Sequence, residues 1–368
     1  MAASCGDDVM EEISLESHRD IARAYDNSLA ARDGQIAVEV PEFAHLLICP
    51  ACSGSLFWAG GSTRCAGCGQ IYPRNDARPQ ADLRLRSDKH HSVCYRPRFG
   101  QDRNVDVDLS IPVDPTSAVD WRAGGPLATE IRYGNRFVAE MLSYFPQARS
   151  DADWMLDLGC GDRRFEEICV RHTRLRYIGV DYDGDRPHLL ADAHALPFQD
   201  QAFSLVISVA VLEHLTFPDI AMAEIFRVLR PGGIFVGTVA FLEPFHMDSH
   251  FHMTHLGLAR VLEQSGLEIV TIAPNPEWDG LRAQAEMALY PGLNPVLQRA
   301  LVALPRGASN AWAGMKQLLG RAASERSLTN VLATTGGFRF VARRPPVAHD
   351  EQREFSYVEL ECRAGQDR

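Results

Sequence analysis

Between residues 154 and 274 the sequence alternates short apolar runs with segments of helical periodicity, and this alternation constrains the fold more than any other feature. The apolar runs have the length of buried strands, and the segments between them carry apolar residues at helical spacing. The pattern predicts a parallel, doubly wound α/β sheet. Strands are expected at 154–158, 177–181, 203–209, 233–239 and 267–272, and helices at about 164–171, 219–229 and 256–265.

The first expected strand runs into a turn that contains two glycines, in the sequence MLDLGCGDRRF. Glycines let a backbone approach a ligand closely, and the helix that follows offers unpaired amides at its N-terminus. A dinucleotide-binding fingerprint would have a third glycine three residues after the second, where this sequence has Arg164. The turn therefore predicts a ligand site of another kind.

Four motifs follow one another in order from this turn. Asp157 lies two residues before Gly159, and Gly161 completes a D-x-G-x-G loop. Asp181 closes the second expected strand in YIGVDY, twenty-two residues after Gly159. Asp192 follows in LLADAHALPF, VAVLEHL comes after the fourth strand, and RVLRPGG comes before the fifth.

This set of motifs resembles class I S-adenosylmethionine (SAM)-dependent methyltransferases, in particular the broad small-molecule branch called type 11, over about residues 126–274. The resemblance implies a Rossmann-like sheet in which the first acid and the loop hold the methionine part of SAM. The second acid accepts the ribose hydroxyls, and the third, with its neighbouring alanine, lies at the adenine. The implied SAM-binding residues are Asp157, Gly159, Gly161, Asp181, Asp192 and Ala193. Taken singly, Asp157 or Asp181 can also cap a helix or a turn.

Two features depart from that family. Arg163 stands where a third glycine is common in the loop. Only ten residues separate Asp181 from Asp192, too few for the usual intervening helix. One face of the sheet is therefore expected to be thinly covered.

Four of the nine cysteines form two CxxC pairs, CPAC and CAGC, with twelve residues between them. Cys49, Cys52, Cys65 and Cys68 can complete a tetrahedral shell of four sulfurs, which suits a structural zinc ion with no open position. A pair of local disulfides is the alternative. The sequences LLICPACSGSL and CAGCGQIYPRNDARP resemble the small zinc-ribbon activator that partners tRNA, rRNA and release-factor methyltransferases. The resemblance implies an internal support for the catalytic domain; a ribbon that grips substrate is the alternative.

The chain divides into five expected regions. A polar N-terminal segment (1–40, with a helix near 13–31) precedes the zinc ribbon (41–80), a surface linker (81–125), the methyltransferase domain (126–345) and a polar tail (346–368). Within the domain an amphipathic helix is expected at 131–145, and a helical insertion at 275–335 precedes a last strand at 337–342. Residues 278–345 hold nine Lys and Arg against three Asp and Glu. The insertion is expected either to cap an acceptor pocket for an acidic or amphiphilic substrate, or to be a solvated helical pair packed on the sheet.

The loop after the fifth expected strand, FLEPFHMDSHFHMTHLGL, is rich in histidine and leaves the edge of the sheet where ligands bind in open α/β folds. Imidazole suits a general base near neutral pH, which methyl transfer needs only if the acceptor retains a proton. The histidines could instead bind a metal or be structural; His255 is expected to open the helix that starts at Thr254, and His214 of the LEHL sequence could line SAM. The candidate catalytic residues are His214, His246, His250 and His252.

A net charge of −11 argues against broad binding to nucleic acid, which needs a cationic surface. The sequence has no apolar run long enough to span a membrane and no secretory signal at its N-terminus, so a cytoplasmic protein is expected. We expect transfer of a methyl group to an oxygen or nitrogen of a small molecule or glycan. One alternative is a tRNA, rRNA or protein methyltransferase with the ribbon as substrate-binding or activating module; the absence of an Asn-Pro-Pro-Tyr type motif argues against it. The other alternative is a non-catalytic scaffold of the same fold.

Overall fold

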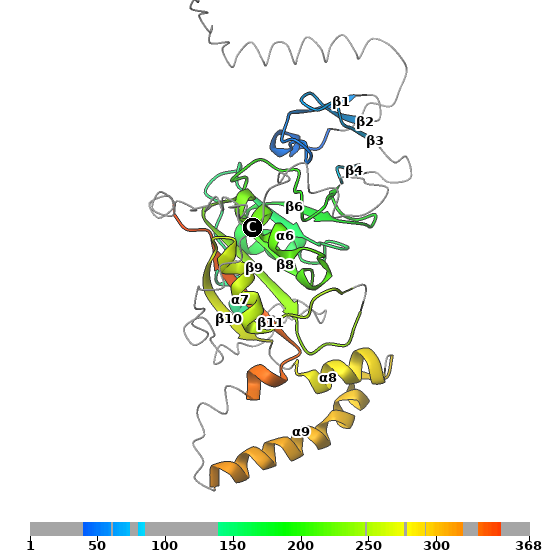
Figure 1. The fold of residues 1–368 in the computed structure, drawn as a ribbon, viewed down its shortest axis with the longest axis vertical. Helices are drawn as coiled ribbons and strands as arrows, with labels where there is room; N and C mark the ends of the chain where they lie inside the picture. The colour runs from blue at the N-terminus through cyan, green and yellow to red at the C-terminus, as the bar shows by residue number, and fades with distance from the viewer. Residues whose placement is uncertain are drawn as a thin grey trace, which may run out of the picture.

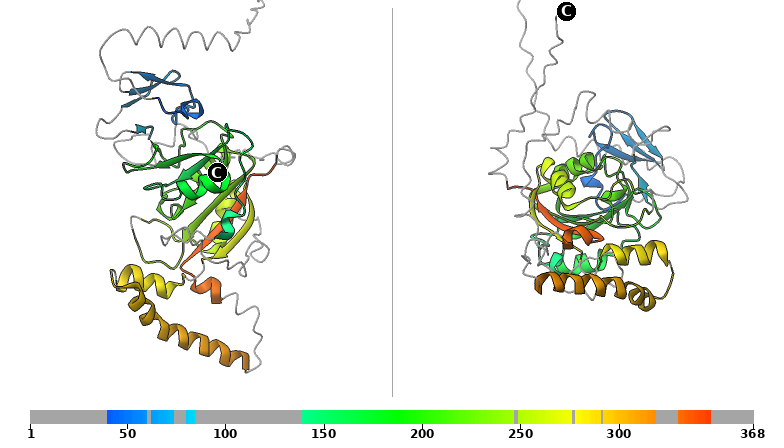
Figure 2. Two further views of the ribbon diagram at one scale, coloured as in Figure 1. Left: turned by 180° about the vertical axis from the view of Figure 1, so that it is seen from behind. Right: turned by 60° about the horizontal axis from the view of Figure 1, so that its bottom comes forward.

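The computed structural model describes residues 40–59, 62–73, 80–84, 139–246, 249–275, 278–290, 292–318 and 330–346. An α/β domain forms its centre, with a small sheet at one end and a pair of helices at the other (Figures 1 and 2). The helix expected near 13–31, the linker from 85 onward, the first part of the 131–145 helix and the tail from 347 lie outside the described residues.

The α/β domain is built on an eight-stranded sheet in the order β10-β11-β9-β8-β5-β6-β7-β4. The five strands that the apolar runs predict are confirmed, with small shifts at their ends. β5 is buried at every position, and a strand that is buried on both faces carries nearly continuous apolar side chains, which is why it appears in the sequence as an apolar run. The strands are β4 (Ala81–Asp82), β5 (Trp154–Leu158), β6 (Arg176–Asp181), β7 (Leu189–Leu190), β8 (Phe203–Val209), β9 (Leu229–Ala240), β10 (Glu268–Pro274) and β11 (Gly337–Arg343).

The sheet is mixed, although the five strands expected within residues 154–274 all run in the same direction, as the sequence pattern predicted; the strand that runs the other way is the last one, β11. The strands from β4 to β9 pair in parallel, but β11 runs antiparallel to both β9 and β10. After the helical insertion the chain re-enters the sheet at the end where β9 and β10 finish. β11 therefore runs antiparallel to both of these neighbours. Periodicity reports which residues are buried and not the direction of a strand.

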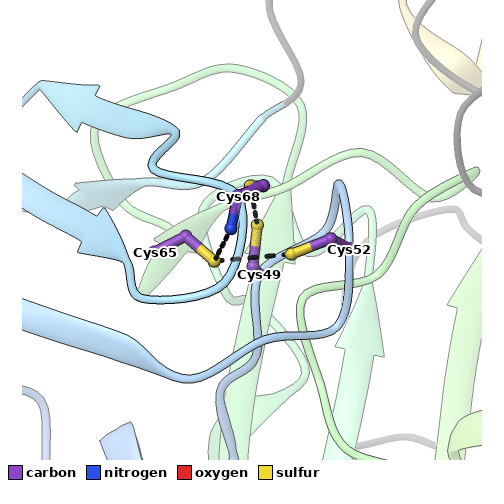
Figure 3. Close-up of side chains that lie close together, drawn as sticks. All are labelled: Cys49, Cys52, Cys65 and Cys68. Carbon is purple, nitrogen blue, oxygen red and sulfur yellow. Dashed lines mark hydrogen bonds between the residues drawn. The ribbon is translucent and has the colours of Figure 1, made fainter.

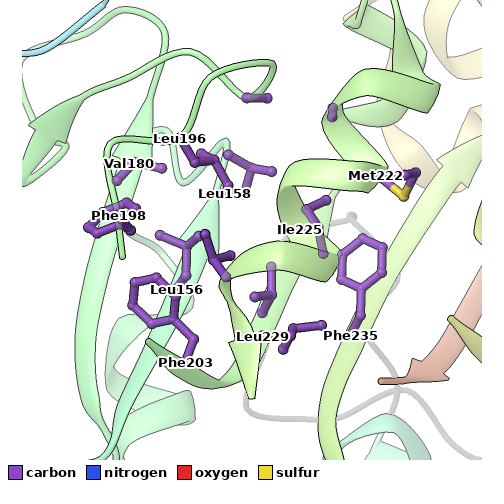
Figure 4. Close-up of a cluster of buried hydrophobic side chains, with 14 of the residues drawn as sticks. Leu156, Leu158, Val180, Leu196, Phe198, Phe203, Met222, Ile225, Leu229 and Phe235 are labelled. Atoms are coloured by element: carbon purple, nitrogen blue, oxygen red, sulfur yellow. The ribbon is translucent and has the colours of Figure 1, made fainter. Parts of the chain in front are cut away.

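Helices cover both faces of this sheet, as a doubly wound fold requires. On one face, α6 (Pro218–Val228) and α7 (His255–Gln264) contribute to a cluster around Leu156 and Phe235, in which Met222 and Ile225 of α6 are fully buried (Figure 4). On the other face, α4 (Ala139–Leu142) and α5 (Glu166–Thr173) contribute to a second cluster around Met155. The helix α7 begins as expected, because the Thr254 hydroxyl accepts a hydrogen bond from the Gly257 amide at 3.1 Å.

The zinc-ribbon region forms a three-stranded antiparallel sheet of β1 (Leu56–Ala59), β2 (Ser62–Cys65) and β3 (Ile71–Pro73), preceded by a short 3-10 helix, η1 (Ala44–Leu46). It is joined to the large domain by backbone hydrogen bonds: the Ile48 amide donates to the Pro197 carbonyl at 3.0 Å, and the Gln199 amide to the Leu46 carbonyl at 2.9 Å. The ribbon and the α/β domain therefore form a continuous structure.

Side chains before the ribbon sheet cover part of the large domain. Phe43 and Leu47 belong to the same hydrophobic cluster as Trp154, and the Phe43 ring packs edge-on against the Trp154 ring at 6.4 Å. No helix forms between Asp181 and β7, as the short spacing predicted. Phe43 also lies beside His188, at the end of that short connection, with 6.4 Å between ring centroids. The ribbon segment thus packs next to the connection where the helix is absent.

Ala81 and Asp82 form the edge strand β4, although the sequence placed them at the start of a linker. They pair in parallel with Leu189 and Leu190 of β7. The Asp82 carboxylate is held by Arg84, whose guanidinium donates to it at 2.7 Å. A strand of two residues is too short to leave a periodic signal, which is why the sequence pattern did not reveal it.

The helical insertion before the last strand is confirmed. It consists of α8 (Gly280–Gln284), a π-helical turn η3 (Ala285–Leu289) and the long helix α9 (Pro295–Leu318), which extends beyond the end of the sheet in Figures 1 and 2. Arg306 of α9 forms an ion pair with Asp279, which also caps α8. No helix within the described ranges combines the length and hydropathy needed to cross a membrane.

Candidate functional site

The loop after β5 holds three residues in the left-handed region of backbone space: Gly159 at φ +73°, Gly161 at φ +53° and Arg163 at φ +60°. A Cβ atom on Gly159 would lie 2.2 Å from Cγ2 of Val211, so this glycine allows a close approach between two loops. A Cβ atom on Gly161 would meet no atom within 4 Å. The loop therefore presents its backbone to open space at Gly161. Arg163 adopts the conformation that favours glycine and turns its guanidinium to His188 and Glu166.

Asp157 lies beneath this loop at the end of β5 and is only 1% exposed. Its Oδ2 atom accepts a hydrogen bond of 2.5 Å from the Tyr177 hydroxyl on the neighbouring strand β6. Burial raises the pKa of the Asp157 carboxyl to about 7, and the charge of Asp181 adds to that rise, whereas the Tyr177 hydrogen bond opposes it. The group is thus poised to change its charge near neutral pH. The sequence pattern did not indicate Tyr177 as a partner of Asp157.

Asp181, at the end of β6, is in direct contact with the glycine loop. Its Oδ2 accepts a hydrogen bond from the Gly161 amide at 2.8 Å, and its Oδ1 accepts one from the Tyr182 amide at 2.7 Å. The strand β5 has parallel neighbours on both sides, β6 and β8. From β5 the chain builds the sheet toward one edge through β6, and from β8 it builds the sheet toward the other edge. Ligands of doubly wound sheets bind at such switch points, so the expected loop residues lie where a ligand is expected.

Asp192 and Ala193 follow β7 and are both buried. Asp192 Oδ1 accepts hydrogen bonds from the backbone amide and the Nδ1 atom of His194, at 3.0 and 2.7 Å. The Nε2 atom of His194 accepts in turn from the Phe217 amide at 3.2 Å, which fixes the neutral imidazole with its proton on Nδ1. This chain of hydrogen bonds joins the Asp192 turn to the start of α6. His194 was not singled out in the sequence, although it lies within the quoted LLADAHALPF motif.

The loops after β8 and β9 bring a second set of polar side chains together. Glu213 and His214 belong to the 3-10 turn η2 (Leu212–His214), and His246 comes from the loop after β9. One ligand atom from each of the three lies within 4.8 Å of the other two. The carbonyl of Glu213 accepts from the amides of His250 and Phe251, at 2.6 and 3.0 Å, which ties the two loops to each other.

The four candidate histidines are only partly brought together. The rings of His214 and His246 are 5.2 Å apart, and the His252 ring is 5.7 Å from that of His246. The His250 Nε2 atom instead faces the hydroxyl of Thr216 at 3.5 Å. The sequence did not indicate Glu213 as a site residue, although it precedes His214 in LEHL. Only the fold places its carboxylate near the imidazole of His246 as well.

The four cysteines converge within the ribbon (Figure 3), and their sulfur atoms all lie within 4.8 Å of one another. The Cys49 and Cys68 sulfurs are 3.7 Å apart and those of Cys52 and Cys65 are 3.4 Å apart. A tetrahedron with Zn–S bonds of 2.3 Å has an edge of about 3.8 Å, close to both separations. All four thiols are free, so the structure holds none of the local disulfides considered from the sequence. The amides of Gly67 and Cys68 lie within 3.5 Å of the Cys65 sulfur, as donors to a thiolate do.

Comparison with known families finds a match in the part of the chain that holds the glycine loop. Residues 156–237 match the family model described as "Methyltransferase domain", Methyltransf_11. The α/β domain has the fold of class I methyltransferases, and part of it is similar in sequence to that family. The matched range runs from β5 into β9 and includes the glycine loop, Asp181 and the loop that carries Glu213 and His214.

Two curated relatives illustrate this similarity. A Mycolicibacterium smegmatis protein named "Probable S-adenosylmethionine-dependent methyltransferase" is 32% identical over 142 residues, which are 31% of this chain and 52% of that protein. The fatty-acid O-methyltransferase of the same species is 32% identical over 121 residues, 29% of this chain and 44% of that protein. The chain thus spans about half the length of these relatives. Among solved structures, the [4+2]-cyclase SpnF matches with a TM-score of 0.36 and 21% identity, covering 61% of this chain and 90% of the cyclase.

Proposed function

We propose that the protein is a SAM-dependent methyltransferase that acts on an oxygen or nitrogen of a small-molecule or glycan acceptor. One observation carries the proposal: the loop after β5 presents its backbone at Gly161 to open space, between a buried acid and the acid at the end of β6. The methyltransferase domain match supports SAM as the ligand of that space.

The acids around the glycine loop and the open space at Gly161 support SAM as the ligand. We assign the methionine part to Asp157 and the backbone of Gly159 and Gly161, because a carboxylate and free space at the loop suit its ammonium group. We assign the ribose hydroxyls to Asp181 and the adenine to the turn at Asp192 and Ala193. SAM supplies a methyl group already activated on a sulfonium sulfur. The task of the protein is then to align the acceptor atom with that carbon, and positioning of this kind can supply about 7–11 kcal/mol.

We assign the acceptor side to the loops after β8 and β9. His214 and His246 lie there, and Val211 of the same loop touches Gly159 of the SAM loop. Imidazole can serve on this side as a proton acceptor or as a metal ligand. The fatty-acid O-methyltransferase among the relatives supports a small-molecule acceptor.

We further propose that Cys49, Cys52, Cys65 and Cys68 bind a structural zinc ion and that the ribbon supports the methyltransferase domain. The sulfur separations support zinc, and the packing of Phe43 and Leu47 in the core of the large domain supports the supporting role. The resemblance to a small activator protein of methyltransferases points the same way.

The first experiment measures protection of the full chain from unfolding by SAM. At one hundred times the dissociation constant, SAM should add about 2.7 kcal/mol to the free energy of unfolding. Asp181→Asn should lose most of that gain, while Asp183→Asn, a matched change at an exposed acid two residues away, should keep it. Protection by NADH instead of SAM, or by neither, would overturn the assignment.

The second experiment identifies the acceptor class. The full chain is incubated with radiolabelled SAM and an extract that has been divided into small molecules, glycans, RNA and protein. The label should enter the small-molecule or glycan fraction. Label in RNA or in protein would reject the proposed acceptor class and favour the macromolecular alternative; SAM binding without labelling of any fraction would favour the non-catalytic scaffold.

A further inference from the structure

We propose that Glu213, His214 and His246 bind one divalent transition-metal ion of the first row, such as Mn²⁺, Fe²⁺ or Zn²⁺, separately from the zinc ribbon. The three side chains come from two loops that follow neighbouring parallel strands, β8 and β9. Each contributes one ligand atom to a group in which no two of these atoms are more than 4.8 Å apart.

The donor set itself is informative. Two imidazoles and one carboxylate could hold a metal ion through three positions and would leave others open for water or substrate. Such nitrogen and oxygen donors suit Mn²⁺, Fe²⁺ and Zn²⁺, whereas the all-sulfur set of the ribbon suits zinc. The two sites of this chain therefore differ in the metals that they prefer.

The hydrogen bonding of His246 prepares one nitrogen for a metal. The His246 Nδ1 atom lies 2.9 Å from the carbonyl oxygen of Pro244, and a carbonyl can only accept, so Nδ1 carries the proton. Nε2 is then the nitrogen that we assign to the metal. Histidines that bind metals commonly donate from the other ring nitrogen to a backbone carbonyl or a carboxylate, which fixes the ring and its tautomer.

Buried carboxylates supply negative charge around the cluster. Glu213 is 1% exposed, and a buried carboxylate is stable when it is paired or coordinates a metal. A second carboxylate, Glu243, lies beside His246: its Oε2 is 3.9 Å from His246 Nε2, and its Oε1 accepts a hydrogen bond of 2.7 Å from the indole of Trp278. Trp278 thus orients a second carboxylate toward the imidazole that we assign to the metal.

The position of the cluster suggests a role, which rests on the proposed function. Both loops lie at the carboxyl edge of the sheet, the edge that also carries the glycine loop. A metal ion there would have open positions on the acceptor side. It would hold an acceptor oxygen and favour loss of its proton to solvent before that oxygen attacks the methyl carbon.

The test is a binding titration of the full chain with its ribbon saturated with zinc. Free Mn²⁺ is followed by electron paramagnetic resonance, and bound Co²⁺ by its visible absorption, which distinguishes nitrogen and oxygen ligands from thiolates. We expect one Mn²⁺ or Co²⁺ per chain beyond the zinc. His246→Ala and Glu213→Gln should each weaken binding at least about tenfold. The matched control is His250→Ala, in the same loop but facing Thr216, which should bind as the wild type does.

Two results would overturn the proposal. In the first, the folded wild type binds neither Mn²⁺ nor Co²⁺ beyond the zinc. In the second, it binds one of them, but His246→Ala binds that ion with the same affinity. Glu213 is buried and its variant could fail to fold, but His246 is partly exposed and keeps the test decisive. Protection by SAM is measured in the same samples. Protection by SAM without metal uptake rejects the metal site alone, and metal uptake without protection by SAM rejects the proposed function alone.

Discussion

The two glycines of the loop after β5 are needed for different reasons. Gly159 combines a positive φ with a neighbour, Val211, that leaves no room for a Cβ atom. Gly161 has a positive φ but faces open space. The first glycine therefore serves the folded structure, and the second serves the ligand that we propose.

This difference can be measured with two alanine variants. Gly159→Ala should lower the free energy of unfolding by about 2–4 kcal/mol, the combined cost of backbone strain and a clash. Gly161→Ala should cost only about 1–2 kcal/mol, from backbone strain alone, and yet should abolish protection by SAM. Chemical denaturation with and without SAM gives both quantities. Equal losses of stability in the two variants would contradict the different environments.

The buried acid Asp157 makes a prediction about pH. Its pKa of about 7 lies above the ordinary value near 4, so in the unliganded protein this group favours the folded state at low pH, and the contribution is lost as pH rises toward and through 7. SAM, through its ammonium, should bind the ionised form. Its affinity should then fall as pH drops from 8 to 6, by up to about tenfold per unit below the pKa.

Calorimetric titration at pH 6 and pH 8 tests this linkage. In the wild type, binding at pH 6 should release close to one proton, which titrations in buffers of different ionisation enthalpy reveal. Asp157→Asn should bind SAM more weakly at pH 8 and show no such proton release. An affinity that does not depend on pH in the wild type would show that Asp157 stays ionised or does not face SAM.

Among the secondary-structure elements, the helix α9 has two faces of different exposure. Val302 is 6% exposed, whereas Leu304, two residues further along the chain, is 82% exposed. Leu297, Leu301, Trp312 and Met315 are also exposed, at spacings that place them with Leu304 on one side of the helix. This apolar side of α9 is therefore not its packed side.

Serine substitutions should separate the two faces. Val302→Ser should lower the free energy of unfolding by about 1–3 kcal/mol, because a buried side chain loses its packing. Leu304→Ser should change it by less than about 0.5 kcal/mol, as expected for an exposed position. Thermal denaturation of the full chain supplies the comparison. A large loss in Leu304→Ser would mean that this residue is covered in solution.

The same scale shows how far the sequence predicted the fold. The long strands and helices of the methyltransferase domain were found, because each buries one face or both and so has a period. The strands β4 and β7 were missed because two residues carry no period, and the antiparallel direction of β11 because strand direction depends on how the insertion returns.

The candidate site was predicted to a similar depth. Motif spacing placed Asp157, Asp181 and the glycines at one site; a hydrogen bond joins Gly161 to Asp181, and the role of these residues as SAM ligands stays a prediction. Tyr177, His194 and Glu213 were missed, because each acquires its partner from pairing or loop contacts between segments that are distant in the chain. Spacing along one segment cannot report such contacts.

At the scale of the whole molecule, the ribbon and the methyltransferase domain share one hydrophobic core. Phe43 is 5% exposed and packs in the cluster of the large domain, whereas Phe57, on β1 of the ribbon, is 50% exposed. The stability of the domain should therefore depend on the segment before the ribbon sheet and on the zinc ion that we propose for the ribbon.

Matched phenylalanine variants test this dependence. Phe43→Ala should lower the free energy of unfolding of the full chain by about 3–5 kcal/mol, and Phe57→Ala by less than about 1 kcal/mol. Removal of zinc by a strong chelator should reduce protection by SAM along with the loss of the ribbon, if the two regions unfold together. A methyltransferase domain whose stability is unaffected by both treatments would show that the ribbon is a separate module.

The pairing of β4 with β7 has a consequence for how the protein is made. Asp82 leaves the ribosome more than one hundred residues before Leu190, its partner in the sheet. Until β7 is synthesised, the sheet edge that pairs with Ala81 and Asp82 does not exist. The ribbon segment therefore stays without this contact during that time. Contacts of such long range form late and slowly. Zinc bound to the four cysteines, as we propose, would order this early segment before its partner strand is synthesised and so limit its aggregation.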